Sequence, residues 1–136
     1  MNDEEIDRLL EKIYDLKVLY VEDNQGVRIQ TIKMLSNFFI NIQSAKNGTE
    51  GLALYNENKF DIVITDVNMP IMNGIEMSKA IRLQDKNIPI IAMSAHNEKE
   101  ILQDIEKQNI QAYIFKPIDL DKFIEVLDDI FIDRIT

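Results

Sequence analysis

The chain has 136 residues, the size of one ordinary domain, and 46% of them are hydrophobic, which is enough for a real core. Its formal net charge of -9 argues against direct nucleic-acid binding, because phosphate contacts need clustered lysine and arginine side chains. Cysteine is absent, which excludes disulfides, and a single histidine disfavours a zinc site. No apolar run is long enough for a membrane span, which excludes membrane insertion. Together these features lead us to expect a cytoplasmic protein.

Residues 1–16 are predicted to form an amphipathic helix or linker that precedes the main domain, residues 17–136. Apolar residues recur there at steps of three and four, which favours a helix, and Asp3 is a candidate for its N-cap. The apolar residues are Ile6, Leu9, Leu10, Ile13 and Tyr14. Two interpretations stay open: the helix packs on its own domain, or it is a connector or dimerisation helix.

From residue 17 onward, short apolar runs alternate with helical patterns five times. The expected strands are 17–21, 40–45, 62–66, 88–93 and 112–115. The expected helices are 27–39, 49–56, 74–83, 98–108 and 119–131. Strands that are apolar throughout are typical of a sheet covered on both faces, so the pattern predicts an α/β fold with a parallel five-stranded sheet.

Polar and charged residues follow four of these strands. Glu22 and Asp23 follow the first, Asp66 ends the third, Ser94 follows the fourth and Lys116 follows the fifth. Parallel strands deliver such residues to one edge of the sheet, where open α/β sheets bind ligands. Neighbouring carboxylates repel one another unless they take up protons or a cation. An oxygen-only ligand set of this kind suits Mg²⁺.

Four short motifs resemble the receiver domain of bacterial two-component response regulators. They are VEDN at 21–24, DVNMP at 66–70 followed by Gly74, MSA at 93–95 and FKP at 115–117. KNGTEGL at 46–52 and Tyr113 are also similar to that family, and the resemblance covers about residues 17–131. It implies a doubly wound (βα)5 fold with strand order 2-1-3-4-5, here with an extra N-terminal helix.

The resemblance also implies the roles of the strand-end residues. Asp66 would be the phosphoacceptor, receiving a phosphoryl group from a phosphohistidine on a partner protein. Lys116 would pair with the phosphoryl oxygens, and Ser94 would donate a hydrogen bond to another of them. The partner would be a sensor histidine kinase or a histidine phosphotransfer protein, and the chain would catalyse only its own phosphorylation and dephosphorylation.

Magnesium binding and tuning of the phosphoryl lifetime are implied in the same way. The metal ligands would be Glu22, Asp23, Asp66 and the backbone carbonyl of Asn68. Asn68, two residues after the phosphoacceptor, and His96, two residues after Ser94, would tune the lifetime, although an exposed loop histidine without a role is the alternative for His96. Both positions would lie near the path of the attacking water.

Signalling requires a conformational switch, for which the resemblance implies Ser94 and Tyr113. Phosphorylation would draw Ser94 inward, Tyr113 would fill the vacated space, and a downstream target would bind the face made by the fourth helix, fifth strand and fifth helix of the (βα)5 unit. The alternative for Tyr113 is an ordinary residue of an edge strand. Whether the chain is a stand-alone regulator or a piece of a hybrid kinase stays open.

Three other functions share part of this pattern. A non-phosphorylated pseudo-receiver would act only as an interaction module, but it would lack part of the acid set. A haloacid-dehalogenase-type phosphatase, which also uses Mg²⁺ and an aspartyl phosphate, has a second aspartate where this chain has Asn68. A flavodoxin-like carrier needs a phosphate loop after the first strand, and Glu22 and Asp23 would repel that phosphate.

Overall fold

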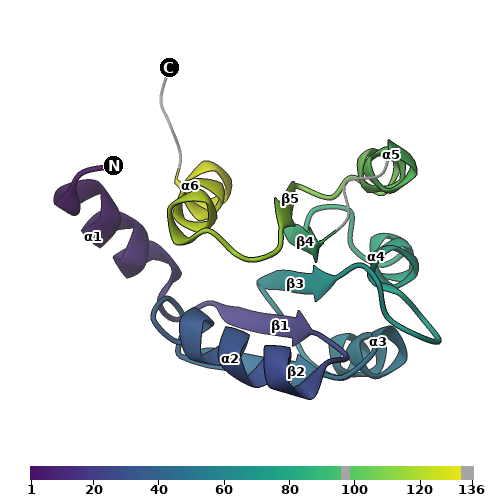
Figure 1. The fold of residues 1–136 in the computed structure, drawn as a ribbon. Coiled ribbons are helices and arrows are strands. Elements are labelled where there is room, and N and C mark those ends of the chain that lie inside the picture. The colour runs from purple at the N-terminus through teal and green to yellow at the C-terminus, as the bar shows by residue number, and fades with distance from the viewer. Residues whose placement is uncertain (96–98, 133–136) are drawn as a thin grey trace.

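The computed structural model describes residues 1–95 and 99–132, which form a parallel five-stranded sheet between two layers of helices (Figure 1). The strands are β1 (Lys17–Val21), β2 (Asn41–Ala45), β3 (Ile62–Asp66), β4 (Ile90–Ser94) and β5 (Ala112–Phe115). The helices are α1 (Asp3–Ile13), α2 (Gln25–Leu35), α3 (Gly48–Glu57), α4 (Gly74–Arg82), α5 (Lys99–Lys107) and α6 (Leu120–Phe131). The strand order is β2-β1-β3-β4-β5, which confirms the predicted fold class and topology.

The central strands are buried on both sides, as their continuous apolar runs predict. In β1, Val18 and Tyr20 belong to one core, with residues of α1 and α6. Leu19 and Val21 belong to the other, with residues of α4 and α5. All four strand residues are completely buried. Successive side chains point to opposite faces, so a strand enclosed by two helix layers needs apolar residues at every position.

The edge strand β2 departs from this pattern. Asn41 and Gln43 are exposed, and only Ala45 is fully buried. Ile40, expected to begin the strand, precedes it and is 55% exposed. The expectation of a continuously apolar strand was therefore wrong here, because β2 pairs with β1 alone and the helices cover it incompletely.

Helix α2 is also shorter than its apolar pattern predicts. It begins at Gln25, after an Asn24 side chain that accepts a hydrogen bond from the backbone N–H of Val27, and it ends at Leu35. Phe38 and Phe39 lie beyond the helix but are buried in the core. Because these two loop residues are apolar and buried, the hydrophobic spacing continues past Leu35 as if the helix had one more turn.

The N-terminal helix α1 packs against the same domain. Leu9 and Ile13 are completely buried, in the core cluster that also holds Phe123 and Leu127 of α6. Its N-cap is Asn2 rather than Asp3, and the Asn2 and Glu5 side chains form a reciprocal capping box. Within the described residues, no helix combines the length and the apolar character that a membrane crossing requires.

The loop between β3 and α4 follows Asp66 and has an unusual backbone conformation. Ile71 has φ of 71°, in the left-handed region, and its side chain is 84% exposed. A β-branched residue is strained there, and exposure leaves it little burial as compensation. The next residue, Met72, accepts a hydrogen bond from the N–H of Gly48 at 3.1 Å, which ties this loop to the start of α3.

Ile71→Asn is expected to stabilise the protein by about 1 kcal/mol, because asparagine tolerates the left-handed conformation. The free energy of unfolding in urea measures the effect. Ile71→Val, which keeps the β-branch and the strain, is the matched control and should stay within a few tenths of a kcal/mol of the parent. Equal stability of the two variants would contradict the strain at this position.

Candidate functional site

Three carboxylates meet at the edge of the sheet where the strand order reverses. Glu22 and Asp23 follow β1, Asp66 ends β3, and these two strands are hydrogen-bonded neighbours. A carboxylate oxygen from each residue lies within 4.8 Å of the other two. Glu22 and Asp66 are buried, with 1% and 6% of their surface exposed, whereas Asp23 is open to solvent. The structure thus brings together the three acids on which the metal-site prediction depends.

Lys116 lies against two of these carboxylates. Its Nζ is 2.6 Å from Glu22 Oε1 and 3.2 Å from Asp66 Oδ1. Burial disfavours the ammonium, but the hydrogen bond to Glu22 and the negative charge of Asp66 outweigh it and raise the pKa of Lys116. The lysine therefore carries a fixed positive charge. A cis peptide joins it to Pro117, and its backbone N–H donates to Ser94 O at 2.9 Å, which connects the ends of β4 and β5.

Glu22 is held by its surroundings from several sides. Besides Lys116, the backbone N–H of Asn24 donates to its Oε2 at 3.3 Å. Its main-chain carbonyl accepts from Arg28 Nη1 at 2.8 Å. The Arg28 contact was not anticipated from the sequence, which shows only an arginine in the first turn of a helix. Asp23, by contrast, is the solvent-exposed acid of the three.

The residues of this cluster fit a hard divalent cation. All the donors are carboxylate oxygens, the kind of ligand that Mg²⁺ takes. When ionised, three carboxylates facing one ammonium leave an excess of negative charge. Burial and the neighbouring Glu22 carboxylate raise the pKa of Asp23, as expected for an acid in an under-neutralised cluster.

Asp23→Asn is expected to raise the melting temperature of the metal-free protein at pH 7. Because the pKa of Asp23 is raised in the folded chain, the folded chain binds this proton more tightly than the unfolded chain does. The free energy of unfolding therefore falls as pH rises from 3.8, the ordinary pKa of the group, through the raised value of the folded chain. The gain should disappear below pH 3.8, where both states are protonated. Thermal denaturation in EDTA across this pH range measures it.

The same variant should lose most of the stabilisation by added Mg²⁺, because the accessible ligand is gone. Asp7→Asn, an exposed charge removal on α1, serves as the control and should retain the full response to Mg²⁺. A metal-free Asp23→Asn protein less stable than the parent at pH 7 would contradict the repulsion within the cluster.

Asn68 and Ser94 are in direct contact. Asn68 Nδ2 donates a hydrogen bond to Ser94 Oγ at 3.2 Å, from the β3–α4 loop to the end of β4. Ser94 is completely buried, and Asn68 is exposed. This contact was not predicted, because the sequence suggested separate tasks for the two residues. It places an amide and a hydroxyl side by side next to Asp66, which pairs in register with Met93.

Tyr113 lies on β5, an edge strand of the sheet. Its half-buried ring packs edge-on against Phe115, with ring centroids 5.0 Å apart. Phe115 is 50% exposed and Leu120, at the start of α6, is 49% exposed. Figure 1 shows β5 between α5 and α6. His96 lies outside the described residues.

An apolar groove of about 520 Å³ opens beside Lys116. One wall is α2, and the other is the chain that leaves β4 and β5. The lining residues are Val27, Gln30, Thr31, Met34, Ala95, Lys116, Pro117 and Ile118. Val27, near the start of α2, is 36% exposed and lines this groove. The charged site therefore adjoins a surface suited to an apolar protein partner.

Comparisons with known proteins agree on one family. Residues 18–128 match the family model described as the response regulator receiver domain. The chain is 34% identical over 115 residues to the chemotaxis protein CheY of Listeria monocytogenes, covering 83% of this chain and 96% of that protein. It is 30% identical over 106 residues to sporulation initiation phosphotransferase F of Bacillus subtilis, covering 78% of this chain and 86% of that protein.

Solved structures give the same result. A chain of the CheX–CheY–BeF3–Mg²⁺ complex from Borrelia burgdorferi superposes with a TM-score of 0.82 at 27% identity. This similarity covers 91% of the present chain and 98% of that chain. The described geometry and the similar proteins thus agree on the fold.

Proposed function

Because this chain belongs to the response regulator receiver domain family, we propose that it accepts a phosphoryl group on Asp66 and thereby switches a protein-binding face. Proteins of this family are signalling modules of two-component phosphorelays. The observation that carries the proposal is the position of Asp66, buried at the sheet edge with Lys116 on one side and the other two acids within 4.8 Å. This arrangement provides a nucleophile, a fixed positive charge and a place for a divalent cation.

The reaction is an in-line transfer between two proteins. An Asp66 carboxylate oxygen attacks the phosphorus of a phosphohistidine, the new O–P bond forms, and the N–P bond breaks with its electron pair leaving on the imidazole. Lys116 Nζ, 3.2 Å from Asp66 Oδ1, is placed to pair with a phosphoryl oxygen there. To do so it exchanges its contact with Glu22 for one with the incoming group.

Glu22, Asp23, Asp66 and the Asn68 backbone carbonyl would hold Mg²⁺. The bound ion supplies positive charge that offsets the acid cluster and stabilises the anionic phosphoryl group in transfer. Asp23, the exposed member, gives the ion access from solvent. Asn68 Nδ2 donates to Ser94 Oγ at 3.2 Å, and the Ser94 hydroxyl would donate its own hydrogen to a phosphoryl oxygen.

The switch would begin at Ser94. A phosphoryl oxygen that accepts a hydrogen bond from the Ser94 hydroxyl would draw the end of β4 toward Asp66 and so displace Ser94 relative to Asn68. Ser94 pairs in register with Phe115, whose ring packs against Tyr113, so the displacement reaches the α5–β5–α6 face. A downstream target protein would bind that face, and Asn68 and His96 would set the lifetime of the aspartyl phosphate.

A histidine kinase or histidine phosphotransfer protein would supply the phosphoryl group. The apolar groove between α2 and Pro117 lies beside Lys116 and offers such a donor a docking surface next to Asp66. Docking of this kind holds the phosphohistidine in line with the carboxylate, which is the main contribution that a protein donor adds over a small molecule. The chain itself would act on no other substrate.

Intact mass after incubation with acetyl phosphate tests the proposal. With Mg²⁺, the wild-type protein is expected to gain one phosphoryl group, and it should gain none in EDTA or as Asp66→Asn. Asp119→Asn, which replaces an exposed N-cap of α6, is the control carboxylate and should be phosphorylated normally. A folded wild-type protein that gains no phosphoryl group would favour the pseudo-receiver, an interaction module without phosphorylation.

A further inference from the structure

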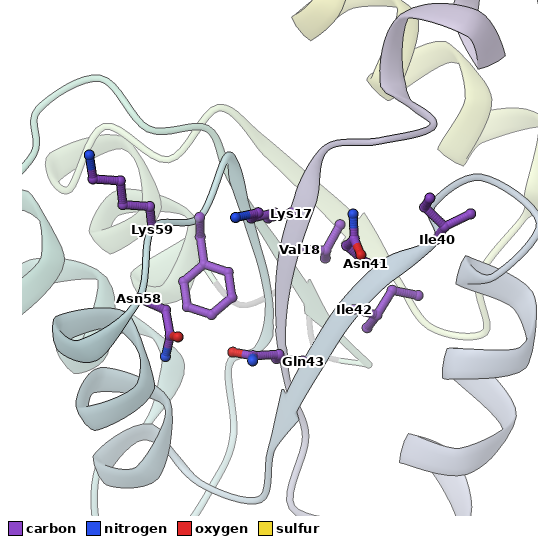
Figure 2. A pocket seen from close by; sticks show the side chains of 9 residues that line it. Lys17, Val18, Ile40, Asn41, Ile42, Gln43, Asn58 and Lys59 are labelled. Carbon is purple, nitrogen blue, oxygen red and sulfur yellow. The ribbon is translucent and has the colours of Figure 1, made fainter.

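Figure 2 shows a second hollow, of about 290 Å³. It lies at the end of the sheet where β1 begins, whereas the acid cluster follows the last residue of β1. It forms where β1 and β2 begin and where the chain passes from α3 to β3. The lining residues are Lys17, Val18, Ile40, Asn41, Ile42, Gln43, Asn58, Lys59 and Phe60. We propose that this hollow binds a small phosphorylated ring compound of mononucleotide size, independently of the phosphoacceptor site.

The hollow exists because α3 does not cover the beginnings of β1 and β2. The helix ends at Glu57, where Asn58 Nδ2 donates to Leu54 O at 2.9 Å and stops it. The parallel register then sets Lys17 beside Asn41, and Leu19 beside Gln43. Figure 2 shows Lys17 and Gln43 reaching from the two strands toward the side on which Asn58 lies. The start of the sheet therefore presents polar side chains where a helix would otherwise pack.

Positive charge gathers at this hollow in an acidic protein. The ammonium groups of Lys17 and Lys59 are exposed, and neither forms an ion pair within the described residues. The adjacent acid, Asp61, accepts a hydrogen bond at 2.8 Å from the backbone N–H of Lys17 and offsets part of this positive charge. Two ammonium groups against one carboxylate leave a local excess of positive charge that attracts an anion, even though the net charge of the chain is -9.

The remaining lining residues favour a flat ring over a bare anion. Phe60 is half-buried and packs against the core that contains Leu19 and Val21 of β1. Its exposed part leaves some of the ring available for stacking. Asn41 and Gln43 carry amides that combine donor and acceptor, the pattern that recognises the edges of nucleobases. Lysine side chains are suited to phosphate.

The size of the hollow limits the ligand. Small-molecule sites commonly measure about 300–1,000 Å³, so this one lies at the lower end and admits one nucleotide rather than a dinucleotide. Lys17 begins β1, and Glu22 follows its last residue, so the two sites lie at opposite ends of one strand. Occupation of the hollow therefore leaves Asp66 and Lys116 free.

Titration of the ¹⁵N-labelled protein with AMP tests this inference. EDTA in the buffer prevents metal-mediated binding of AMP at the acid cluster. Saturable shifts are expected in the amides of residues 17–18, 40–43 and 58–60, with a Kd of about 1 mM or tighter. Adenosine and inorganic phosphate should each bind at least about 5-fold more weakly, since each lacks one half of the contacts.

Lys17→Gln and Phe60→Leu should each weaken AMP binding about 5- to 10-fold, a loss equivalent to one good contact. Lys86→Gln removes an exposed lysine outside the hollow and should leave the affinity unchanged. Shifts that do not saturate, shifts centred on Glu22 and Lys116, or equal losses in Lys17→Gln and Lys86→Gln would overturn the site. Equal affinity for AMP and phosphate would overturn the ligand class. Phosphorylation of Asp66 is a separate readout, which Lys17→Gln should leave intact.

Discussion

Lys116→Met is expected to slow phosphorylation of Asp66 by acetyl phosphate about 100- to 1,000-fold, the usual effect of removing one fixed charge from a transfer site. Lys116 Nζ lies 3.2 Å from Asp66 Oδ1, so it is the protein's own positive charge at the position that the phosphoryl group would enter. Methionine has a similar length without the charge. Intact mass against time, at saturating Mg²⁺, measures the rate.

The same substitution should destabilise the metal-free protein by about 1–3 kcal/mol, because it leaves two buried carboxylates without their shared partner. Adding Glu22→Gln should restore much of this stability but not the transfer rate, which separates the structural role of the ammonium from its catalytic one. Lys122→Met is the matched control, since its 3.9 Å contact with Glu125 is exposed on α6. If both lysine variants behave alike, Lys116 has no special role.

The parts of the fold that the sequence predicts well are those with a single physical explanation. The three central strands, β1, β3 and β4, were located closely because burial on both faces requires an uninterrupted apolar run, which few other elements of this length show. The candidate site followed from the same pattern, since parallel strands deliver their last residues to one edge. Glu22, Asp66 and Lys116 are far apart in the chain and meet there for this reason alone.

The features that were missed depend on local competition or on side-chain packing. Asn2 and Asp3 are both good N-caps, and the position of Glu5 decides between them only once the helix is in place. The buried Phe38 and Phe39 extend the apolar pattern of α2 past its end. The hydrogen bond between Asn68 and Ser94 joins the β3–α4 loop to the end of β4, and no spacing in the sequence encodes this approach.

Gly74→Ala is expected to cost about 2–3 kcal/mol of stability and to abolish most phosphoryl transfer to Asp66, through displacement of the main chain rather than loss of a functional group. A Cβ at Gly74 would lie 2.2 Å from the carbonyl oxygen of Asp66 and 3.1 Å from its carbonyl carbon. The same glycine donates its N–H to Val67 O at 3.0 Å, so α4 begins directly against the nucleophile's backbone. Urea unfolding and the rate of mass gain with acetyl phosphate measure both effects.

Gly26→Ala provides the control, because it adds the same methyl group to the start of a different helix beside the site. The atom that its Cβ would approach is Asn24 Oδ1 at 3.4 Å, an ordinary contact distance, and alanine is favoured over glycine in a helix by up to about 1 kcal/mol. This variant should therefore be as stable as the parent or more so, with normal transfer. Stability of Gly74→Ala equal to that of Gly26→Ala would mean that the β3–α4 loop can move away from Asp66. The close approach would then not be what fixes the position of the nucleophile.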